Sequence, residues 1–204
     1  MSCMNKEDIW IDPILYTGKP ENVADRSASE QAVYAFLDSL GIFFERLDHE
    51  AAPSIDHCER VEKRLGAHIC KNLFLCNRQK TKFYLLLMPG KKPFRTKELS
   101  RQIGSARLSF ADPAHMEHFL HTAPGSASVL GLLFDREHRV RLLIDQDIAE
   151  SPLFACHPCA NTSSLRFRTA DLLERILPAM DVRPFYVSLG WSGTLETPPS
   201  SSCE

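Results

Sequence analysis

The six residues from Phe83 to Met88 constrain the fold more than any other part of the sequence. They are apolar throughout and show no alternation with polar residues. A strand with one face in water alternates between the two kinds of residue, whereas a strand covered on both faces reads as a continuous apolar run. This segment therefore predicts a central strand of a sheet that is covered on both sides.

A second extended run lies just before this strand. It covers Ile69–Cys76 and is joined to Lys82–Met88 by the polar residues 77–81, which are typical of a turn. Two extended runs with a short polar connection indicate a hairpin-like pair, so the sheet is not built from βαβ units alone.

Helical and extended patterns alternate along the rest of the chain. Ser27 and Glu30 have the spacing of a capping box, and Asp112 with Pro113 gives the cap and first-turn proline of another helix. Further helices are expected near residues 54–65, 96–103 and 170–177, and strands near 42–47, 129–134, 139–145, 165–167 and 185–189. This order predicts an α/β (α+β) domain with a mixed sheet at residues 27–189, between an N-terminal extension (1–26) and a flexible C-terminal tail (190–204).

The size and composition of the chain agree with a compact enzyme without identifying one. Its 204 residues suit one domain with a full core. No apolar run approaches the roughly 20 residues of a membrane helix, and the first residues lack the apolar stretch of a signal peptide. We therefore expect a cytoplasmic protein without membrane contact. The sequence leaves its oligomeric state open.

Cysteine and histidine clusters offer two alternative chemistries. Seven scattered cysteines do not resemble a secreted disulfide framework, so we expect reduced thiols. The pair Cys156 and Cys159 has CxxC spacing, but no second pair completes a zinc site and the following residues are a poor helix interior. His115, His118 and His121 lie three residues apart, but no further ligand is obviously placed. We expect no metal and no cofactor.

Charge is distributed unevenly along the chain. Residues 1–60 hold 12 acidic and 5 basic residues, whereas residues 78–101 hold eight basic residues and one acidic residue. The basic segment could be an ordinary solvated face, or it could contact the phosphates of a nucleic acid. In the second case the candidate contacts are Lys80, Lys91, Lys92, Arg95 and Lys97.

Four short blocks follow one another between residues 70 and 162. They are CKNLFL (70–75), RLSFA (107–111), PGSASVLGLLFD (124–135) and HPCANT (157–162). Taken in this order, the blocks resemble the YbaK/ProX family, the free-standing relatives of the editing domain of bacterial prolyl-tRNA synthetases. The resemblance runs from about residue 32 to 189. It implies a mixed, partly barrel-like sheet flanked by helices, and an enzyme that hydrolyses tRNA charged with the wrong amino acid.

Lys71 is the first candidate for a catalytic residue. In a strand it shares a face with Leu73 and Leu75, and a lysine there either snorkels to solvent or is held at a site. The resemblance implies the second reading, because the family's essential lysine maps onto Lys71. Its ammonium could bind the terminal phosphate of the tRNA or stabilise an oxyanion. We favour the clamping role, because a solvated lysine, with a pKa of about 10.4, is a poor base at neutral pH.

Gly125 and His157 are the other catalytic candidates that the resemblance implies. Gly125 could be part of an ordinary turn, but it could also let the backbone approach the ester. The family closes this loop with proline, and here that position is Val129. His157 could stabilise a turn or face the substrate. The expected substrate-binding residues are Asn72, Ser126, Ala127, Ser128, Gly131, Asn161 and Thr162.

These inferences lead to a trans-editing deacylase that acts on mischarged tRNA(Pro). No GxSxG elbow, P-loop or GxGxxG is present, so nucleophile hydrolases and nucleotide-driven enzymes are not indicated. The expected substrate is Ala-tRNA(Pro), because a proline pocket rejects the smaller alanine poorly. Alternatives are Cys-tRNA(Pro) deacylation and a non-catalytic module that binds tRNA or a synthetase. Mischarged tRNA is the expected partner, with prolyl-tRNA synthetase as a second candidate.

Overall fold

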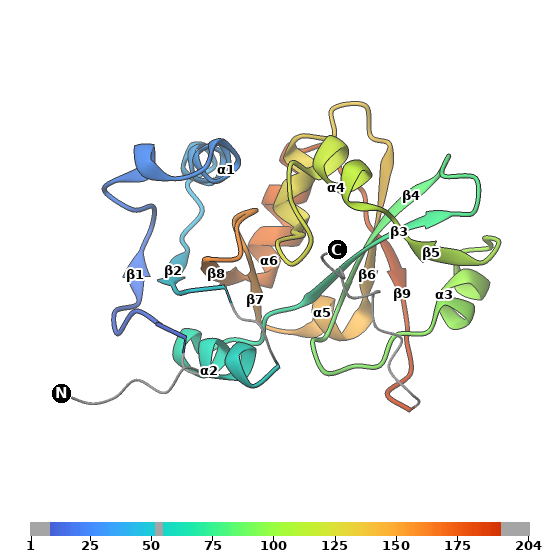
Figure 1. The fold of residues 1–204 in the computed structure, drawn as a ribbon, viewed down its shortest axis with the longest axis horizontal. Coiled ribbons are helices and arrows are strands. Elements are labelled where there is room, and N and C mark those ends of the chain that lie inside the picture. Colours follow the sequence, from blue (N-terminus) through green and yellow to red (C-terminus); the bar gives the residue numbers. More distant parts are fainter. Residues whose placement is uncertain (1–8, 52–54, 193–204) are drawn as a thin grey trace, which may run out of the picture.

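The computed structural model describes residues 9–51 and 55–192, which form two sheets with helices packed around them (Figure 1). The expected α/β class is confirmed. The two sheets do not close into a barrel, so the barrel-like part of the expectation is not observed. No helix in the described ranges is long and apolar enough to cross a membrane.

The larger sheet is mixed and has the strand order β5-β3-β4-β6-β9. Antiparallel pairing joins β3 to β4 and β5, whereas β6 runs parallel to β4 and β9. The central strand β4 is buried along its whole length, as the apolar run predicts. The strands are β3 (Lys71–Asn77), β4 (Phe83–Met88), β5 (Leu108–Phe110), β6 (Val140–Asp145) and β9 (Phe185–Val187).

The smaller sheet is antiparallel and has the order β1-β2-β8-β7. Its strands are β1 (Tyr16–Thr17), β2 (Glu45–Asp48), β7 (Leu153–Cys156) and β8 (Ser163–Arg168). A single parallel bridge between Ile69 and Ala155 joins the two sheets. The start of β3 and the end of β7 therefore lie side by side at this junction.

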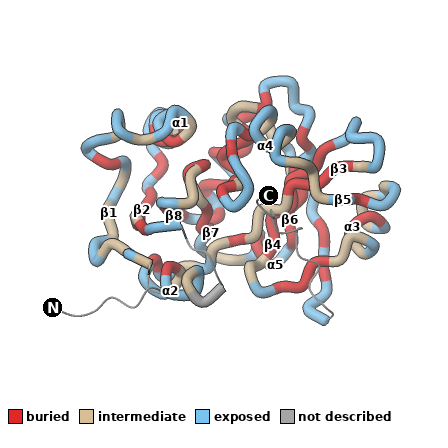
Figure 2. The backbone as a smooth tube through the Cα atoms, in the orientation of Figure 1, coloured by how far each residue is buried: buried red, intermediate tan, exposed pale blue. Residues whose placement is uncertain are grey.

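Helices pack against both faces of the larger sheet and both faces of the smaller one. Buried residues are concentrated where helices and sheets meet (Figure 2). The capping box before α1 is present, with Glu30 N donating to Ser27 Oγ at 3.2 Å. The helices are α1 (Ala28–Ser39), α2 (Ile55–Leu65), α3 (Thr96–Gln102), α4 (Pro113–Leu120), α5 (Gln146–Glu150), α6 (Thr169–Asp171) and α7 (Leu177–Ala179), with a π-helical turn (Leu172–Ile176) between the last two. Two short 3₁₀ helices cover Val23–Asp25 and Val129–Leu133.

The prediction of a strand at residues 129–134 is wrong, because Val129–Leu133 forms the second 3₁₀ helix. A short buried apolar run has no periodicity that separates a strand from a helix. Ser128 caps the segment by accepting a hydrogen bond from Leu130 N at 3.2 Å. A Cβ at Gly131 would lie only 2.8 Å from the carbonyl oxygen of Leu120, so glycine is needed for α4 to pack here.

The N-terminal segment is attached to the smaller sheet. Its strand β1 pairs with β2, and Asp12 N donates to Asp48 O at 3.0 Å. Arg26 at the end of the segment forms an ion pair with Asp48 at 2.6 Å. Residues 9–26, expected as an extension, thus pack against the domain. Residues 1–8 and most of the expected C-terminal tail, 193–204, lie outside the described residues.

Candidate functional site

Lys71 lies at the first position of β3, next to the junction of the two sheets. Its ammonium donates a hydrogen bond to the carbonyl oxygen of Lys92 at 3.0 Å. The predicted face is confirmed, because Leu73 and Leu75 belong to one buried cluster whereas Cys70 and Phe74 belong to another. Partial burial lowers the pKa of Lys71 from its ordinary value. The side chain is therefore a cation held in place, rather than one that snorkels freely.

Lys92, expected on a nucleic-acid-binding surface, is only 1% exposed, so this expectation is wrong. Its ammonium donates to both carboxylate oxygens of Asp145 at 2.9 Å and to Asp147 at 3.0 Å. Asp145 is fully buried and also caps α5 by accepting from Asp147 N. The backbone carbonyl that receives Lys71 thus belongs to a residue anchored by a buried ion cluster.

His157 directly follows β7, two residues after the bridge to β3. Its Nδ1 lies 2.8 Å from the carbonyl oxygen of Ser163, which can only accept, so Nδ1 carries the proton. Burial lowers the pKa of His157 to about 4, and the ring is neutral at pH 7. Neutrality leaves Nε2 with a bare lone pair. His157 can therefore accept a hydrogen bond from a substrate ammonium or from water.

A second histidine, which the sequence analysis did not single out, supports His157. His49 is 3% exposed, and its ring centroid lies 6.1 Å from that of His157. Its Nδ1 donates to Glu50 O at 2.8 Å, so its Nε2 accepts from Ser164 Oγ at 2.9 Å. Ser164 Oγ in turn lies 3.4 Å from His157 Nδ1. The three side chains form one consistently oriented chain of hydrogen bonds.

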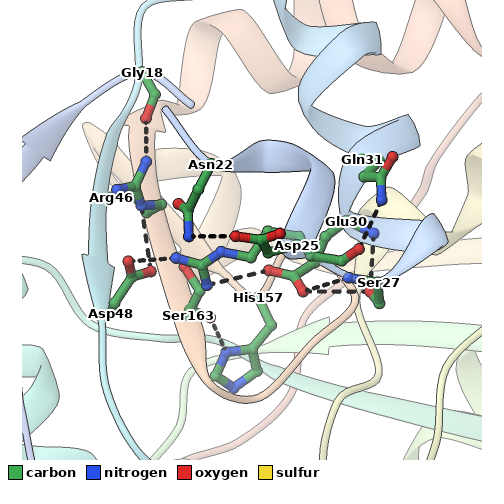
Figure 3. Close-up of polar contacts among 11 residues, drawn as sticks. Gly18, Asn22, Asp25, Ser27, Glu30, Gln31, Arg46, Asp48, His157 and Ser163 are labelled. Carbon is green, nitrogen blue, oxygen red and sulfur yellow. Dashed lines mark hydrogen bonds and ion pairs between the residues drawn. The ribbon is translucent and has the colours of Figure 1, made fainter. Parts of the chain in front are cut away.

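Ion pairs behind the His157 turn join the N-terminal segment to the site (Figure 3). Asp48 is opposite Ser163 across β2 and β8 and is paired with Arg26 and Arg46. Arg46 is 4% exposed and donates to the carbonyl oxygen of Gly18 at 3.0 Å. The segment before α1 therefore holds the strand against which the His157 turn is built.

The loop at residues 124–129 lies next to this turn. Gly125 has a φ of +89°, which side chains rarely adopt, and a Cβ there would lie 3.6 Å from the amide nitrogen of Asn161. Ser128 Oγ donates to the carbonyl oxygen of His157 at 2.6 Å. These contacts bring Gly125, Ser128, His157 and Asn161 together, as the resemblance implies.

The other expected substrate-binding residues differ in their environment. Ser126 bonds within its own turn to Ala123, and Gly131 serves the packing of α4. Asn72 donates its amide to Cys70 O at 3.2 Å, while its own Oδ1 is buried without a hydrogen-bond partner. Thr162 is exposed and its carbonyl oxygen accepts from His49 N, and Ala127 is half-buried in the loop.

The junction of the sheets explains how Lys71 and His157 relate. The parallel bridge pairs Ile69 with Ala155, and each catalytic candidate follows two residues later. Bridged strands lie about 4.8 Å apart, so the two chain segments that carry Lys71 and His157 lie side by side where they leave the junction. Within the described ranges no hydrogen bond joins Lys71 to His157 or to Gly125. The two groups are positioned by separate networks of hydrogen bonds.

Most of the expected tRNA contacts are exposed. Lys80 pairs with Asp112 at 2.8 Å and Lys91 with Glu59 at 2.7 Å, both on the surface. Lys97 is exposed and Arg95 half-buried. Exposed ion pairs contribute little stability, so these cations remain available to a phosphate.

The cysteine and histidine alternatives find no support. Cys156 and Cys159 are buried, and burial raises the pKa of the Cys159 thiol to about 12, away from a reactive thiolate. His115 bonds to Asp112, and His121 stacks on Phe134. Among the described residues no three potential ligands could hold a metal ion together.

Residues 49–174 match the family model of the aminoacyl-tRNA editing domain. The chain is 30% identical over 151 residues to the "Prolyl-tRNA editing protein ProX" of Acetoanaerobium sticklandii, covering 74% of this chain and 92% of that protein. It is also 30% identical over 153 residues to the "Prolyl-tRNA synthetase associated domain-containing protein 1" of Bos taurus, covering 72% of this chain and 86% of that protein.

The fold has solved counterparts. A crystal structure described as a candidate trans-editing enzyme for prolyl tRNA synthetase superposes with a TM-score of 0.60 at 18% sequence identity, covering 81% of this chain and all of that one. The matched residues 49–174 include His49, Lys71, Gly125 and His157. The two networks around the junction therefore lie inside the family's domain.

Proposed function

Since the chain belongs to the aminoacyl-tRNA editing domain family, we propose that it is a trans-acting deacylase that hydrolyses the ester of mischarged tRNA(Pro). The observation that carries this proposal is the junction of the two sheets. The start of β3 places a held ammonium at Lys71 there, and the turn after β7 places the bare Nε2 of a neutral His157 nearby. We place the editing domain at residues 27–189, with residues 9–26 packed against it.

The reaction requires water to attack the ester carbonyl. The carbonyl oxygen becomes an oxyanion, the ribose oxygen leaves as the C–O bond breaks, and the proton from water passes to that leaving oxygen. In our proposal the Lys71 ammonium binds the phosphate next to the ribose, as a point charge. It lowers the barrier by fixing the ester in place rather than by moving a proton.

His157 and Gly125 recognise the aminoacyl group in this scheme. The lone pair on His157 Nε2 accepts from the α-ammonium of the substrate. Gly125 has no side chain between its backbone and the ester, and Asn161 lies beside it. Neutral imidazole suits this role because a protonated ring would repel the substrate ammonium.

Alanine is the amino acid that we propose. A synthetase pocket made for proline cannot strongly exclude the smaller alanine, so a second pocket too small for proline removes the error. Cysteine is the nearest rival. Val129, where the family resemblance implies proline, begins a 3₁₀ helix beside the loop, and we expect this difference to affect the preference between alanine and cysteine.

Purified protein tests the proposal with alanyl-, cysteinyl-, seryl- and prolyl-tRNA(Pro). Faster hydrolysis of the alanyl ester than of the other three supports it. A preference for the cysteinyl ester would keep the activity and change the substrate. Binding of tRNA(Pro) without hydrolysis of any ester would identify a non-catalytic module and overturn the proposal.

A further inference from the structure

Trp191 is an exposed aromatic ring that is held in one position. It is 59% exposed, yet its indole N–H donates to Asp147 Oδ2 at 2.8 Å. The Lys92 ammonium lies 5.3 Å from the centre of the ring. The hydrogen bond to Asp147 fixes the edge of the ring, and the cation–π contact with Lys92 fixes its face against the ion cluster of Lys92, Asp145 and Asp147.

The backbone before Trp191 is fixed as well. Ser188 N donates to the Gln102 side chain at 2.9 Å, and that side chain donates back to Ser188 O at 2.7 Å. Gly190 N donates to Glu98 at 2.9 Å. Both acceptors belong to α3, so this helix and α5 hold residues 188–191 between them. Immobilising an exposed ring costs side-chain entropy and buries little apolar area. A ligand that covers the ring gains from this arrangement, because the entropy of the side chain has already been lost before binding.

The charges around Trp191 favour an anionic ligand. Asp145 and Asp147 are engaged by Lys92, and the Lys71 ammonium lies on the carbonyl of the same lysine. These four charges sum to zero. On α3, by contrast, the basic residues Lys97 and Arg101 outnumber the one acidic residue, Glu98, whose carboxylate accepts the hydrogen bond from Gly190 N. The ring therefore lies between a neutral cluster and a basic helix.

We propose that Trp191 is a stacking surface for an unpaired base at the 3′ end of the tRNA. The inference rests on the proposed function, since the ester is carried by the terminal nucleotide of a single-stranded end. Lys71 and Trp191 share Lys92 as a neighbour, so a phosphate at Lys71 would bring an adjacent base towards the ring. Every base has a π-face, and stacking on an aromatic side chain holds it whatever its identity.

Fluorescence tests this contact directly, because Trp10 and Trp191 are the only tryptophans in the sequence. Trp10 is 48% exposed and attached to the smaller sheet, so it is a matched control. In Trp10→Phe the remaining indole should be quenched when single-stranded RNA ending in CCA is added. In Trp191→Phe, where Trp10 remains, it should not. Quenching of Trp10, or no quenching of Trp191 by bound RNA, would overturn the inference.

Affinity gives the second measurement. Trp191→Ala should weaken binding of uncharged tRNA(Pro) about 5- to 150-fold, the range for loss of one base stack. Trp191→Phe should recover most of the affinity, whereas Trp191→Leu should not, because it is apolar without a π-face. Trp10→Ala should bind as the wild type does. Equal affinities for the leucine and phenylalanine variants would exclude stacking.

The two proposals fail in different ways. If the wild type hydrolyses mischarged tRNA(Pro) and Trp191→Ala binds and hydrolyses it equally well, only the stacking inference is wrong. If Trp191 is quenched by RNA but no ester is hydrolysed, the stacking surface stands and the proposed function is wrong. Circular dichroism of each variant shows whether a loss of binding reflects unfolding.

Discussion

Replacing Lys92 with methionine should strongly destabilise the protein. The substitution keeps the length of a side chain that is 2% exposed but removes three charge-assisted hydrogen bonds. Asp145, which is fully buried, would then be a charge without its cation. Breaking a buried pair in this way costs about 3–5 kcal/mol.

This loss is a large part of the stability of a domain, which is about 5–15 kcal/mol. For a chain of this size each kcal/mol lowers the Tm by about 2–4 °C, so the Tm should fall by about 6–20 °C. Adding Asp145→Asn should restore part of the stability, since it removes the buried charge and leaves an oxygen to cap α5.

Urea unfolding followed by circular dichroism measures the effect. The matched control is Lys91→Met, the neighbouring residue, whose side chain is 63% exposed and pairs with Glu59 on the surface. That variant should unfold close to the wild type. Equal unfolding midpoints for the Lys91 and Lys92 variants would refute the assignment of Lys92 to a buried ion cluster.

Three further predictions concern the site. The pKa of His157 is lowered from 6.5 to about 4, so between these two pH values the unfolded chain binds a proton that the folded chain does not. The free energy of unfolding should therefore be full above about pH 6.5 and fall as the pH approaches 4. Urea unfolding of His157→Gln should show a weaker pH dependence than that of the wild type. Gly125→Val should reduce single-turnover deacylation about 100- to 1,000-fold, whereas Val129→Pro, at the first position of a helix, should stay folded and alter the ratio of alanyl to cysteinyl turnover. Neutralising Lys91, Arg95 and Lys97 together should lower the salt dependence of tRNA binding by about one unit of slope per lost phosphate contact. An unchanged slope would show that these residues form only a solvated face.

Local patterns predicted much of the fold. The continuous run at Phe83–Met88 became the buried β4, and the polar turn before it joins β4 to β3. Capping residues placed the starts of α1 and α4 correctly. These features depend on neighbouring residues, so a single sequence contains their signal.

The features that were missed depend on distant residues. Lys92 lies within a charge run, and its partner Asp145 is 53 positions away, so the sequence suggested a surface. His49 bonds to Ser164 across 115 positions, and the only local hint was a histidine between two acids. At residues 129–133 a buried apolar run could be either strand or helix, and the packing of Gly131 against Leu120 is what explains the helix.

Single-turnover hydrolysis of Ala-tRNA(Pro) by the wild type and Lys71→Ala tests the central claim most directly. The matched control is Lys82→Ala, which removes an exposed lysine before the paired strand β4. The wild type and the Lys82 variant should hydrolyse the ester at similar rates, and Lys71→Ala should lose nearly all activity while remaining folded by circular dichroism. A folded Lys71→Ala protein with the wild-type rate would contradict a reaction centred on the junction of the two sheets.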